Sequence, residues 1–209
     1  MRVLHVLDHS IPLQTGYASR TQAILEAQVA LGWETFQITG PKQGPGTANE
    51  EQVGEWLFHR TPPPGGLLEG LPGLGEMELM GEITFRIEKI AKRVRPHILH
   101  AHSPVLNAIP ALRVGRRLDL PVVYEVRGNW EDAAVARGRG RAGGLRYRLS
   151  RGMESWAFRR VDAIVVISEP LRDDVLARGI PAVKVTLIAD ALVLYQEVYA
   201  RVMQQPRRK

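Results

Sequence analysis

Short apolar runs alternate with amphipathic segments along most of the chain, and this alternation predicts its secondary structure. The apolar runs are rich in β-branched residues and end in polar or turn-forming residues, as buried strands do. The amphipathic segments carry apolar residues at helical spacing. The predicted strands are Val3–Leu7, Thr35–Thr39, Glu55–His59, Ile98–His102, Pro121–Val126, Ala163–Ile167 and Val185–Ile188.

Helices are predicted between these strands. Gly32 and Pro96 end the first two, and Pro110 is expected to break the third near its start. Residues 61–75 are rich in proline and glycine, so they predict a loop. The predicted helices are 17–31, 77–95, Asn107–Leu118, an arginine-rich helix before residue 163, Pro170–Arg178 and Ala191–Met203. Because strands that alternate with helices indicate βαβ units, we expect a single Rossmann-like α/β domain with a mainly parallel sheet of six or seven strands flanked by helices.

The segment after the last predicted strand does not continue this alternation. Ala191–Met203 is amphipathic, and a stripe on one side of it carries Leu192, Tyr195, Tyr199 and Val202. No strand follows this helix, so we expect it to pack back on the domain. We therefore divide the chain into a domain of residues 1–190 and a closing helix with a basic tail, residues 191–209.

Composition narrows the class of protein. Hydrophobic residues make up 44% of the chain and charged residues 24%, as in a globular domain. The absence of cysteine excludes disulfides, a thiolate metal site and a cysteine nucleophile. No run approaches the roughly 20 apolar residues that span a bilayer, and the start MRVLHVLDHS lacks the features of a signal peptide. We expect a cytoplasmic protein, with peripheral contact at the inner membrane face as an additional hypothesis.

The positive charge is concentrated in one stretch. Eight arginines and one acid, Glu154, lie between Arg137 and Arg160, which gives this stretch a formal charge of +7 in a chain of net charge +6. Such a stretch attracts phosphate on a nucleotide, a lipid or a nucleic acid. A solvated arginine-rich helix explains it equally well. Because the basic residues are not interleaved with aromatic residues in a known nucleic-acid motif, we do not expect nucleic acid as the partner.

Polar residues follow four of the predicted strands, and the carboxyl ends of parallel strands meet at one edge of a sheet. This edge is where open α/β sheets bind ligands. Four such coincidences on one edge suggest a site there. The four polar segments are Asp8-His9-Ser10, His100-Ala101-His102-Ser103, Glu125-Val126-Arg127-Gly128-Asn129 and Ser168-Glu169.

Individual residues at this edge allow several interpretations. Gly16 at the start of a helix can admit a phosphate to the backbone, or it can be a plain turn glycine. His100 and His102 share a face of their strand, but we find no carboxylate partner at ligand spacing and predict no metal. His102 at the strand tip suits a contact or base for a substrate hydroxyl, or it is a buried structural histidine. Glu125 and Arg127 share a face and can form a structural ion pair.

Other enzyme classes are poorly supported. The chain has no G-x-G-x-x-G for a dinucleotide and no G-x-x-x-x-G-K-[ST] for a nucleoside triphosphate. It also lacks the G-x-S-x-G turn of serine hydrolases.

Four segments, in this order and spacing, resemble the N-terminal domain of family 4 retaining glycosyltransferases of the GT-B architecture. They are closest to the subgroup associated with exosortase and exopolysaccharide systems, which implies a role in polysaccharide biosynthesis. The segments are MRVLHVLDHSIPLQTGYASRTQAIL with ALGWETFQITGPK after it, RPHILHAHSP, PVVYEVRGNWED and DAIVVISEPLRDDVLARGIPAVKVTLI. The resemblance implies transfer of a sugar from a nucleotide-sugar donor to a carbohydrate or lipid-linked acceptor, with no separate cofactor and no metal.

The resemblance also implies roles for residues at the sheet edge. Thr15 and Gly16 would bind the donor phosphate, and His102 would be catalytic, in contact with the transferred sugar. Many relatives carry Gly-Gly in the first loop and His-Asp after the fifth strand, where this chain has Thr15-Gly16 and Arg127-Gly128. The implied acceptor-binding residues are Tyr17, Ser103, Arg127, Asn129 and Glu131.

The resemblance stops after KVTLI, where relatives continue into a second, donor-binding domain. Only 19 residues follow Asp190, yet ALVLYQEVYARV resembles the family's final helix, which packs back on the N-terminal domain. We therefore expect that the donor domain has been deleted, naturally or by design, and that this chain alone is inactive. The alternatives are a non-catalytic module that binds anions or nucleic acid, and an engineered single-domain scaffold.

Overall fold

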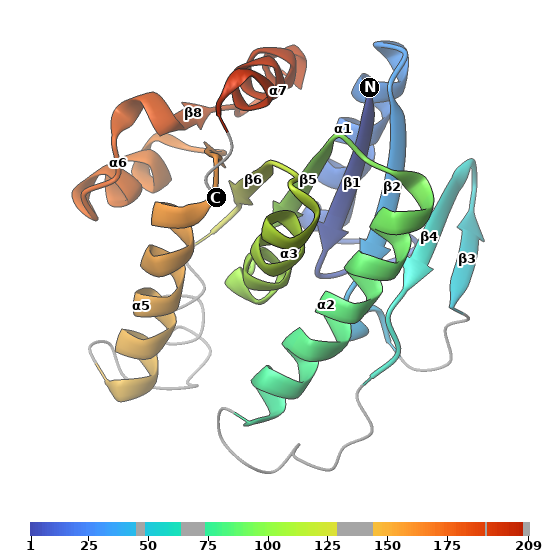
Figure 1. Cartoon of the computed structure of the whole chain (residues 1–209), viewed down its shortest axis with the longest axis horizontal. Helices are drawn as coiled ribbons and strands as arrows, with labels where there is room; N and C mark the ends of the chain where they lie inside the picture. Colours follow the sequence, from blue (N-terminus) through green and yellow to red (C-terminus); the bar gives the residue numbers. More distant parts are fainter. Residues whose placement is uncertain (45–48, 64–73, 129–143, 191, 207–209) are drawn as a thin grey trace.

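Eight strands form one sheet in the order β3-β4-β2-β1-β5-β6-β7-β8 (Figure 1). The computed structural model describes residues 1–44, 49–63, 74–128, 144–190 and 192–206. The strands are β1 (Arg2–Leu7), β2 (Glu34–Thr39), β3 (Glu50–Val53), β4 (Trp56–Arg60), β5 (Ile98–His102), β6 (Val122–Val126), β7 (Ala163–Val166) and β8 (Val185–Leu187). All neighbouring strands are parallel except β3 and β4. The expected α/β domain with a mainly parallel sheet is thus confirmed.

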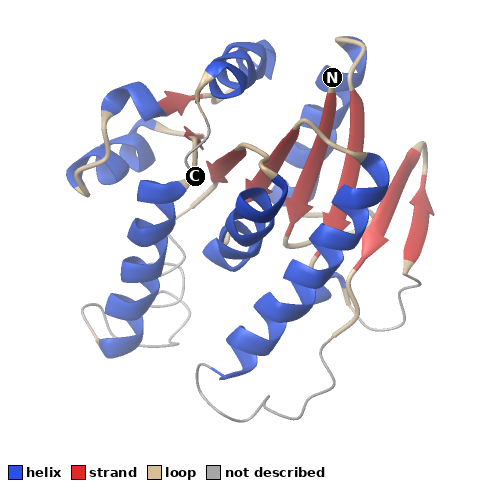
Figure 2. Cartoon of the chain, in the orientation of Figure 1, coloured by secondary structure: helices blue, strands red, loops and turns tan. Residues whose placement is uncertain are grey.

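Helices cover both faces of the sheet, as Figure 2 shows. The described helices are α1 (Gly16–Ala30), α2 (Leu74–Val94), α3 (Val105–Leu118), α5 (Leu145–Arg160), α6 (Glu169–Ala177) and α7 (Tyr195–Gln204), with 3₁₀ turns at Pro41–Gln43, Ala182–Lys184 and Leu192–Leu194. None of the helices in these parts of the chain combines the length and the apolar character that a bilayer crossing requires.

Two details differ from the sequence-based expectation. The sheet has an eighth strand, β3, which pairs antiparallel with β4 through a turn in which Gly54 has a φ of 59°. Its sequence, Glu-Glu-Gln-Val, is too short and too charged to stand out as a strand. Pro110 does not break its helix, because α3 runs from Val105 to Leu118 with Pro110 inside it. The loss of one backbone hydrogen bond is offset by the buried face of α3, which carries Ala108, Ile109, Ala111 and Val114.

Alternate side chains of each strand divide the core into two parts. One set, with Leu4, Leu99 and Tyr124, packs against α2, α3, α5 and α6. The other set, with Val3 and Ile98, packs against α1 and α7. Figure 1 shows α2 and α3 in front of the sheet. The histidines at positions 5, 100 and 102 belong to the second set of positions, so they face α1 and α7.

The C-terminal helix packs back on the domain, as expected. α7 buries Tyr195, Val198, Tyr199 and Val202 against the strand residues of the second core. All four side chains have 1% or less of their surface exposed. The helix therefore covers one side of this core. It packs on β1 and β5, although it lies far from both strands along the sequence.

Candidate functional site

Several predicted site residues come together at the carboxyl ends of β1, β5 and β6. The Arg127 guanidinium donates to the Tyr17 carbonyl at 2.8 Å and to His102 Nδ1 at 2.7 Å. It also lies over the Tyr17 ring, with its central carbon 4.3 Å from the ring centroid. The Arg127 backbone N–H donates to Ser103 Oγ at 3.0 Å. Asn129 and Glu131, the other two predicted acceptor residues, lie outside the described residues.

The two predicted donor-phosphate residues begin α1 and are exposed. Thr15 caps the helix, because its Oγ1 accepts from the Ala18 backbone N–H at 3.1 Å. A Cβ added to Gly16 would meet no atom within 4 Å, so the backbone here is open to an approaching molecule. His9, which belongs to the polar segment Asp8-His9-Ser10 but was given no role of its own, also lies at this edge. Its Nε2 lies 2.9 Å from Thr15 Oγ1 and its ring stacks on Tyr17, but a lone polar residue after a strand gives no signal for such contacts.

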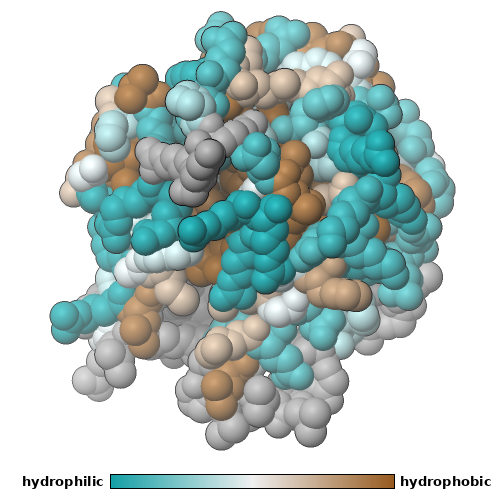
Figure 3. All heavy atoms as spheres, in the orientation of Figure 1, coloured by the Kyte–Doolittle hydropathy of each residue, from teal (hydrophilic) through white to brown (hydrophobic). Residues whose placement is uncertain are grey.

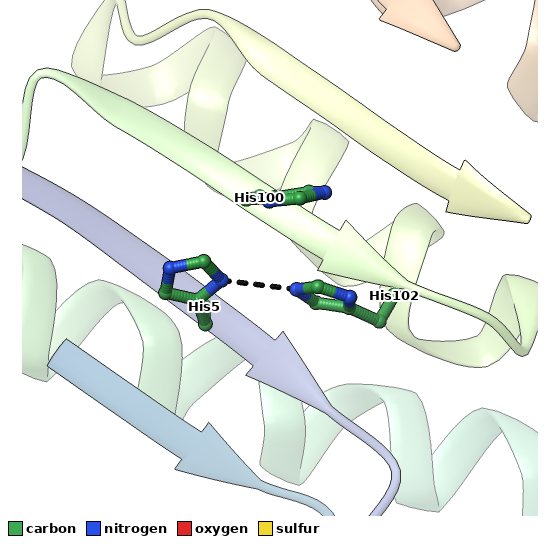
Figure 4. Close-up of side chains that lie close together, drawn as sticks. All are labelled: His5, His100 and His102. Carbon is green, nitrogen blue, oxygen red and sulfur yellow. Dashed lines mark hydrogen bonds between the residues drawn. The ribbon is translucent and has the colours of Figure 1, made fainter. Parts of the chain in front are cut away.

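Below this edge, three histidines from adjacent strands lie close together (Figure 4). His5 comes from β1 and His100 and His102 from β5, and the strand register places His5 directly beside His100. His5 Nδ1 lies 3.0 Å from His102 Nε2. All three side chains have 0% of their surface exposed. Buried imidazoles need hydrogen-bond partners, and the partners here come from α1, β6 and α7.

The three histidines belong to a closed circuit of polar contacts. His5 Nε2 lies 2.9 Å from Gln28 Oε1, and Gln28 Nε2 donates to the Tyr199 hydroxyl at 3.1 Å. This hydroxyl lies 2.6 Å from His100 Nδ1. The circuit returns through Glu125 and Arg127, and we call it the polar ring. Its members are His5, Gln28, His100, His102, Glu125, Arg127 and Tyr199.

Hydrogen-bond chemistry permits one set of tautomers for the ring. Arginine only donates, so His102 accepts at Nδ1 and carries its proton on Nε2. His5 then accepts at Nδ1 and donates from Nε2 to Gln28 Oε1. The Tyr199 hydroxyl accepts from the Gln28 amide and donates to His100 Nδ1. The remaining His100 proton is on Nε2, which lies 3.4 Å from Glu125 Oε2. All three histidines are thus assigned as neutral from the network.

Burial and nearby charge favour the neutral form. Burial, with the proximity of His100, lowers the pKa of His5 to about 3. The pKa of His102 is lowered well below its ordinary value by burial, His100 and Arg127. Burial raises the pKa of Glu125, but Arg127 and the His100 and His102 rings beside it lower it more, and the net result is a strong decrease. The ring therefore contains an ionised Glu125–Arg127 pair among neutral imidazoles.

Two further residues hold Glu125, and sequence reasoning assigned neither of them to a site. Arg20 Nε donates to Glu125 Oε1 at 2.9 Å, and the rest of its guanidinium binds the carbonyls of Ile188 and Ala189. The Tyr195 hydroxyl donates to Glu125 Oε2. The only sign in the sequence that Glu125 belongs to a site was its charge inside an otherwise apolar strand. The pairing that it suggested, Glu125 with Arg127, is present at 2.8 Å.

The three histidines also satisfy a distance requirement for a metal site, because one ligand nitrogen from each lies within 4.8 Å of the others. The tautomers argue against a cation in this arrangement. The free lone pairs of His5 and His102 accept from His102 and Arg127, and that of His100 accepts from Tyr199. A metal would have to displace these donors, and the Arg127 guanidinium would repel it.

The fold is that of one Rossmann-like half of the GT-B architecture, and solved structures support this class. A sucrose-phosphate synthase structure from Thermosynechococcus elongatus matches with a TM-score of 0.66 and 13% identity, covering 97% of this chain and 99% of that chain. A second structure of that synthase matches with a TM-score of 0.63 and 13% identity, covering 90% of this chain and 48% of that one. A UDP-GlcNAc 2-epimerase from Methanocaldococcus jannaschii, in complex with UDP-GlcNAc and UDP, matches with a TM-score of 0.57 and 13% identity, covering 90% of this chain and 46% of that one.

Sequence comparison defines the family. The model of the glycosyl transferase 4-like domain matches residues 15–191, and the chain therefore belongs to this family. No curated protein sequence matches the chain. It spans about half the length of the second synthase structure and of the epimerase.

Proposed function

We propose that this domain is the N-terminal, acceptor-side half of a glycosyltransferase of polysaccharide biosynthesis. The reaction would move a sugar from a nucleotide-sugar donor to a carbohydrate or lipid-linked acceptor. The observation that carries this proposal is that the family match includes an open sheet edge, where Thr15 and Gly16 are exposed beside Tyr17 and Arg127. Donor and acceptor groups can approach one another at such an edge.

The exposed start of α1 supports the donor side of this proposal. The first backbone N–H groups of a helix and its dipole favour a phosphate. At Gly16 no side chain stands between that backbone and a ligand. The epimerase structure names UDP-GlcNAc and UDP as the ligands of that protein, which supports a nucleotide sugar as the ligand class for this fold.

The polar ring supports the acceptor side by fixing Arg127. Four contacts, to Glu125, Tyr17, Thr21 and His102, hold its guanidinium at the edge. The catalytic role of His102 stays a prediction. Its ring is fully buried between His5 and Arg127, so a contact with the sugar requires Arg127 to move aside. Until then His102 acts as a positioning residue for Arg127.

We infer that this chain alone does not transfer sugar, because a GT-B enzyme holds its donor between two domains. In this hypothesis residues 1–190 form the domain and residues 191–209 close it. Our chain covers 99% of the first synthase structure, so the two chains are of similar size. This similar size supports a domain that folds at this length.

We further propose that the domain works in the cytoplasm, in peripheral contact with the inner membrane face. The absence of cysteine supports the compartment. Most of the arginine stretch, from Leu145 onward, forms α5, whereas most of the apolar loop at 61–75 lies outside the described residues.

The donor proposal is tested by titrating the chain with UDP-GlcNAc and with UDP, followed by NMR. The variant Gly16→Val should weaken binding about tenfold, because the added side chain blocks the approach to the backbone. Gly81→Val is the matched control, since a Cβ there also meets nothing within 4 Å and α2 lies on the other face of the sheet. Equal binding by both variants would contradict the donor site.

Assays of sugar transfer and of nucleic-acid binding test the expected inactivity and the alternative functions. Sugar transfer by the isolated chain would overturn its expected inactivity. Salt-sensitive binding of generic RNA or DNA, with no response to nucleotides, would favour the anion-binding module. Silence toward both ligands would favour a scaffold.

A further inference from the structure

A groove of about 1010 Å³ lies between α2, α3 and α5, on the face of the sheet opposite the polar ring. It reaches Val122 at the start of β6 and Asp162 just before β7, so it is near the amino edge of these strands. The donor and acceptor residues of the proposed glycosyltransferase are at the carboxyl edge. The groove is therefore separate from the proposed donor and acceptor residues, and a membrane ligand for it rests on the proposed peripheral contact with the membrane and makes that contact specific.

The inner surface of the groove is apolar, and its apolar character continues to the outside. Ile109, Leu112 and Met153 are among its lining residues. Met77 and Leu149, which also line it, have 62% and 58% of their surface exposed. Figure 3, which views this face, shows hydrophobic residues between the hydrophilic ones. Large exposed apolar side chains beside an apolar groove are typical of a ligand or membrane contact.

Arginines surround this apolar surface. Arg113 and Arg116 come from α3, and Arg148 and Arg160 from α5. All four are exposed. Among the described residues, Arg113, Arg116 and Arg148 form no ion pair. Two acids, Asp119 and Asp162, also line the groove, and Asp162 accepts from the Val122 backbone N–H at 2.7 Å.

Arg160 shows how charge and apolar surface combine here. Its guanidinium lies over the Trp156 ring, with its central carbon 4.2 Å from the ring centroid. Trp156 itself lines the groove and is 37% exposed. An aromatic ring with an arginine over it presents an apolar edge and a cation to the same ligand.

We propose that this groove binds an acyl chain of an anionic membrane lipid, with the head-group phosphate against the arginines. A hydrophilic anion would leave the apolar lining unused, and an uncharged hydrocarbon would leave the arginines unused. A bilayer is favoured over a free fatty acid because Met77 and Leu149 line the groove yet are largely exposed, and a membrane would bury them.

The test is co-sedimentation of the whole chain with vesicles of phosphatidylcholine, with and without phosphatidylglycerol. Binding should require phosphatidylglycerol. Gly152→Trp fills the groove without changing charge, and the position is open because an added Cβ meets nothing within 4 Å. Arg148→Glu reverses one groove charge, and Arg159→Glu is the matched control on the same helix outside the lining. We expect Gly152→Trp and Arg148→Glu each to weaken binding by about tenfold and Arg159→Glu by less than about threefold.

Three results would overturn the proposal. The first is no binding to either kind of vesicle. The second is equal loss with Arg148→Glu and Arg159→Glu, which would indicate general attraction to a charged surface. The third is unchanged binding by Gly152→Trp, with Gly152→Leu as the second filling variant if tryptophan prevents folding. Binding of monomeric lauric acid with no response to vesicles would identify a free fatty acid as the ligand instead.

Discussion

At the scale of single residues, the polar ring is a set of groups that depend on one another. Each histidine is neutral because it is buried, and its neighbours fix which nitrogen carries the proton. Glu125 is charged because Arg127 and Arg20 contact it. In such a network the removal of one partner leaves others buried without a hydrogen bond. The ring should therefore be sensitive to changes that alter no packing volume.

Tyr199→Phe tests this sensitivity. The variant keeps the ring of Tyr199 but leaves Gln28 Nε2 without its acceptor and His100 Nδ1 without its donor. The free energy of unfolding should fall by about 1–3 kcal/mol, measured by urea denaturation. The control Val193→Ala, at an exposed position just before α7, should change it by less than about 0.5 kcal/mol. A loss no larger than that of the control would show that the hydroxyl is not needed.

At the scale of elements, α7 supplies one wall of the second core and two hydroxyls to the site. Its apolar side chains pack against strand residues such as Val3 and Val123. Its tyrosines contact Glu125 and His100. Without the helix, an apolar face and a buried ion pair would both meet water, and each is unfavourable.

Removal of residues 191–209 should therefore yield an insoluble or unfolded chain. A graded version keeps the test informative, because Val202→Ala removes buried methyl groups and should cost roughly 1–3 kcal/mol of unfolding free energy. Gln196→Ala, on the exposed side of α7, is the matched control and should be nearly neutral. Thermal unfolding measures all three. Unchanged stability of the shortened chain would refute the closing role of α7.

At the scale of the whole molecule, the free energy of unfolding should change with pH even at pH values above those where carboxylates titrate. The pKa of His5 is about 3 in the folded chain and 6.5 when unperturbed. Between these values the unfolded chain binds more protons, so stability decreases as the pH falls from 6.5 toward 3. Each of the three histidines adds up to about 1.4 kcal/mol per pH unit. The lowered pKa of Glu125 adds a further loss as the pH falls below about 4.5.

Urea denaturation at pH 7, 6 and 5 measures this dependence. His5→Gln removes one titrating group and should flatten the slope, whereas Val193→Ala, an exposed change that removes no titrating group, should leave it unchanged. The same slope in both variants would exclude His5 as its source.

The fold could be predicted from the sequence because its signals are local. Alternating apolar runs and helical spacing indicated the strands and helices, and the stripe on α7 indicated its packing. β3 was missed because Glu50–Val53 carries two charges in four residues and its only support is pairing with β4. The expected helix break at Pro110 was wrong, because the buried packing of α3 outweighs the loss of one backbone hydrogen bond.

The site was predictable only in part, because its contacts join distant segments. Polar residues after strands located the edge, and the shared face of Glu125 and Arg127 predicted their ion pair. The hydroxyls of Tyr195 and Tyr199 looked like part of an apolar stripe. Their partners, Glu125 and His100, lie 70 and 99 positions away in the sequence, where no local pattern reaches.

The position of α7 has a consequence for how the protein is made. The second core joins Val3 to Val202, so it cannot be completed until the ribosome has synthesised Val202. Until then β1 and β5 present an apolar face and three histidines without their final cover. A nascent chain in this state is a natural client for a chaperone, and translation rate rather than sequence alone will influence how much of it reaches the folded state.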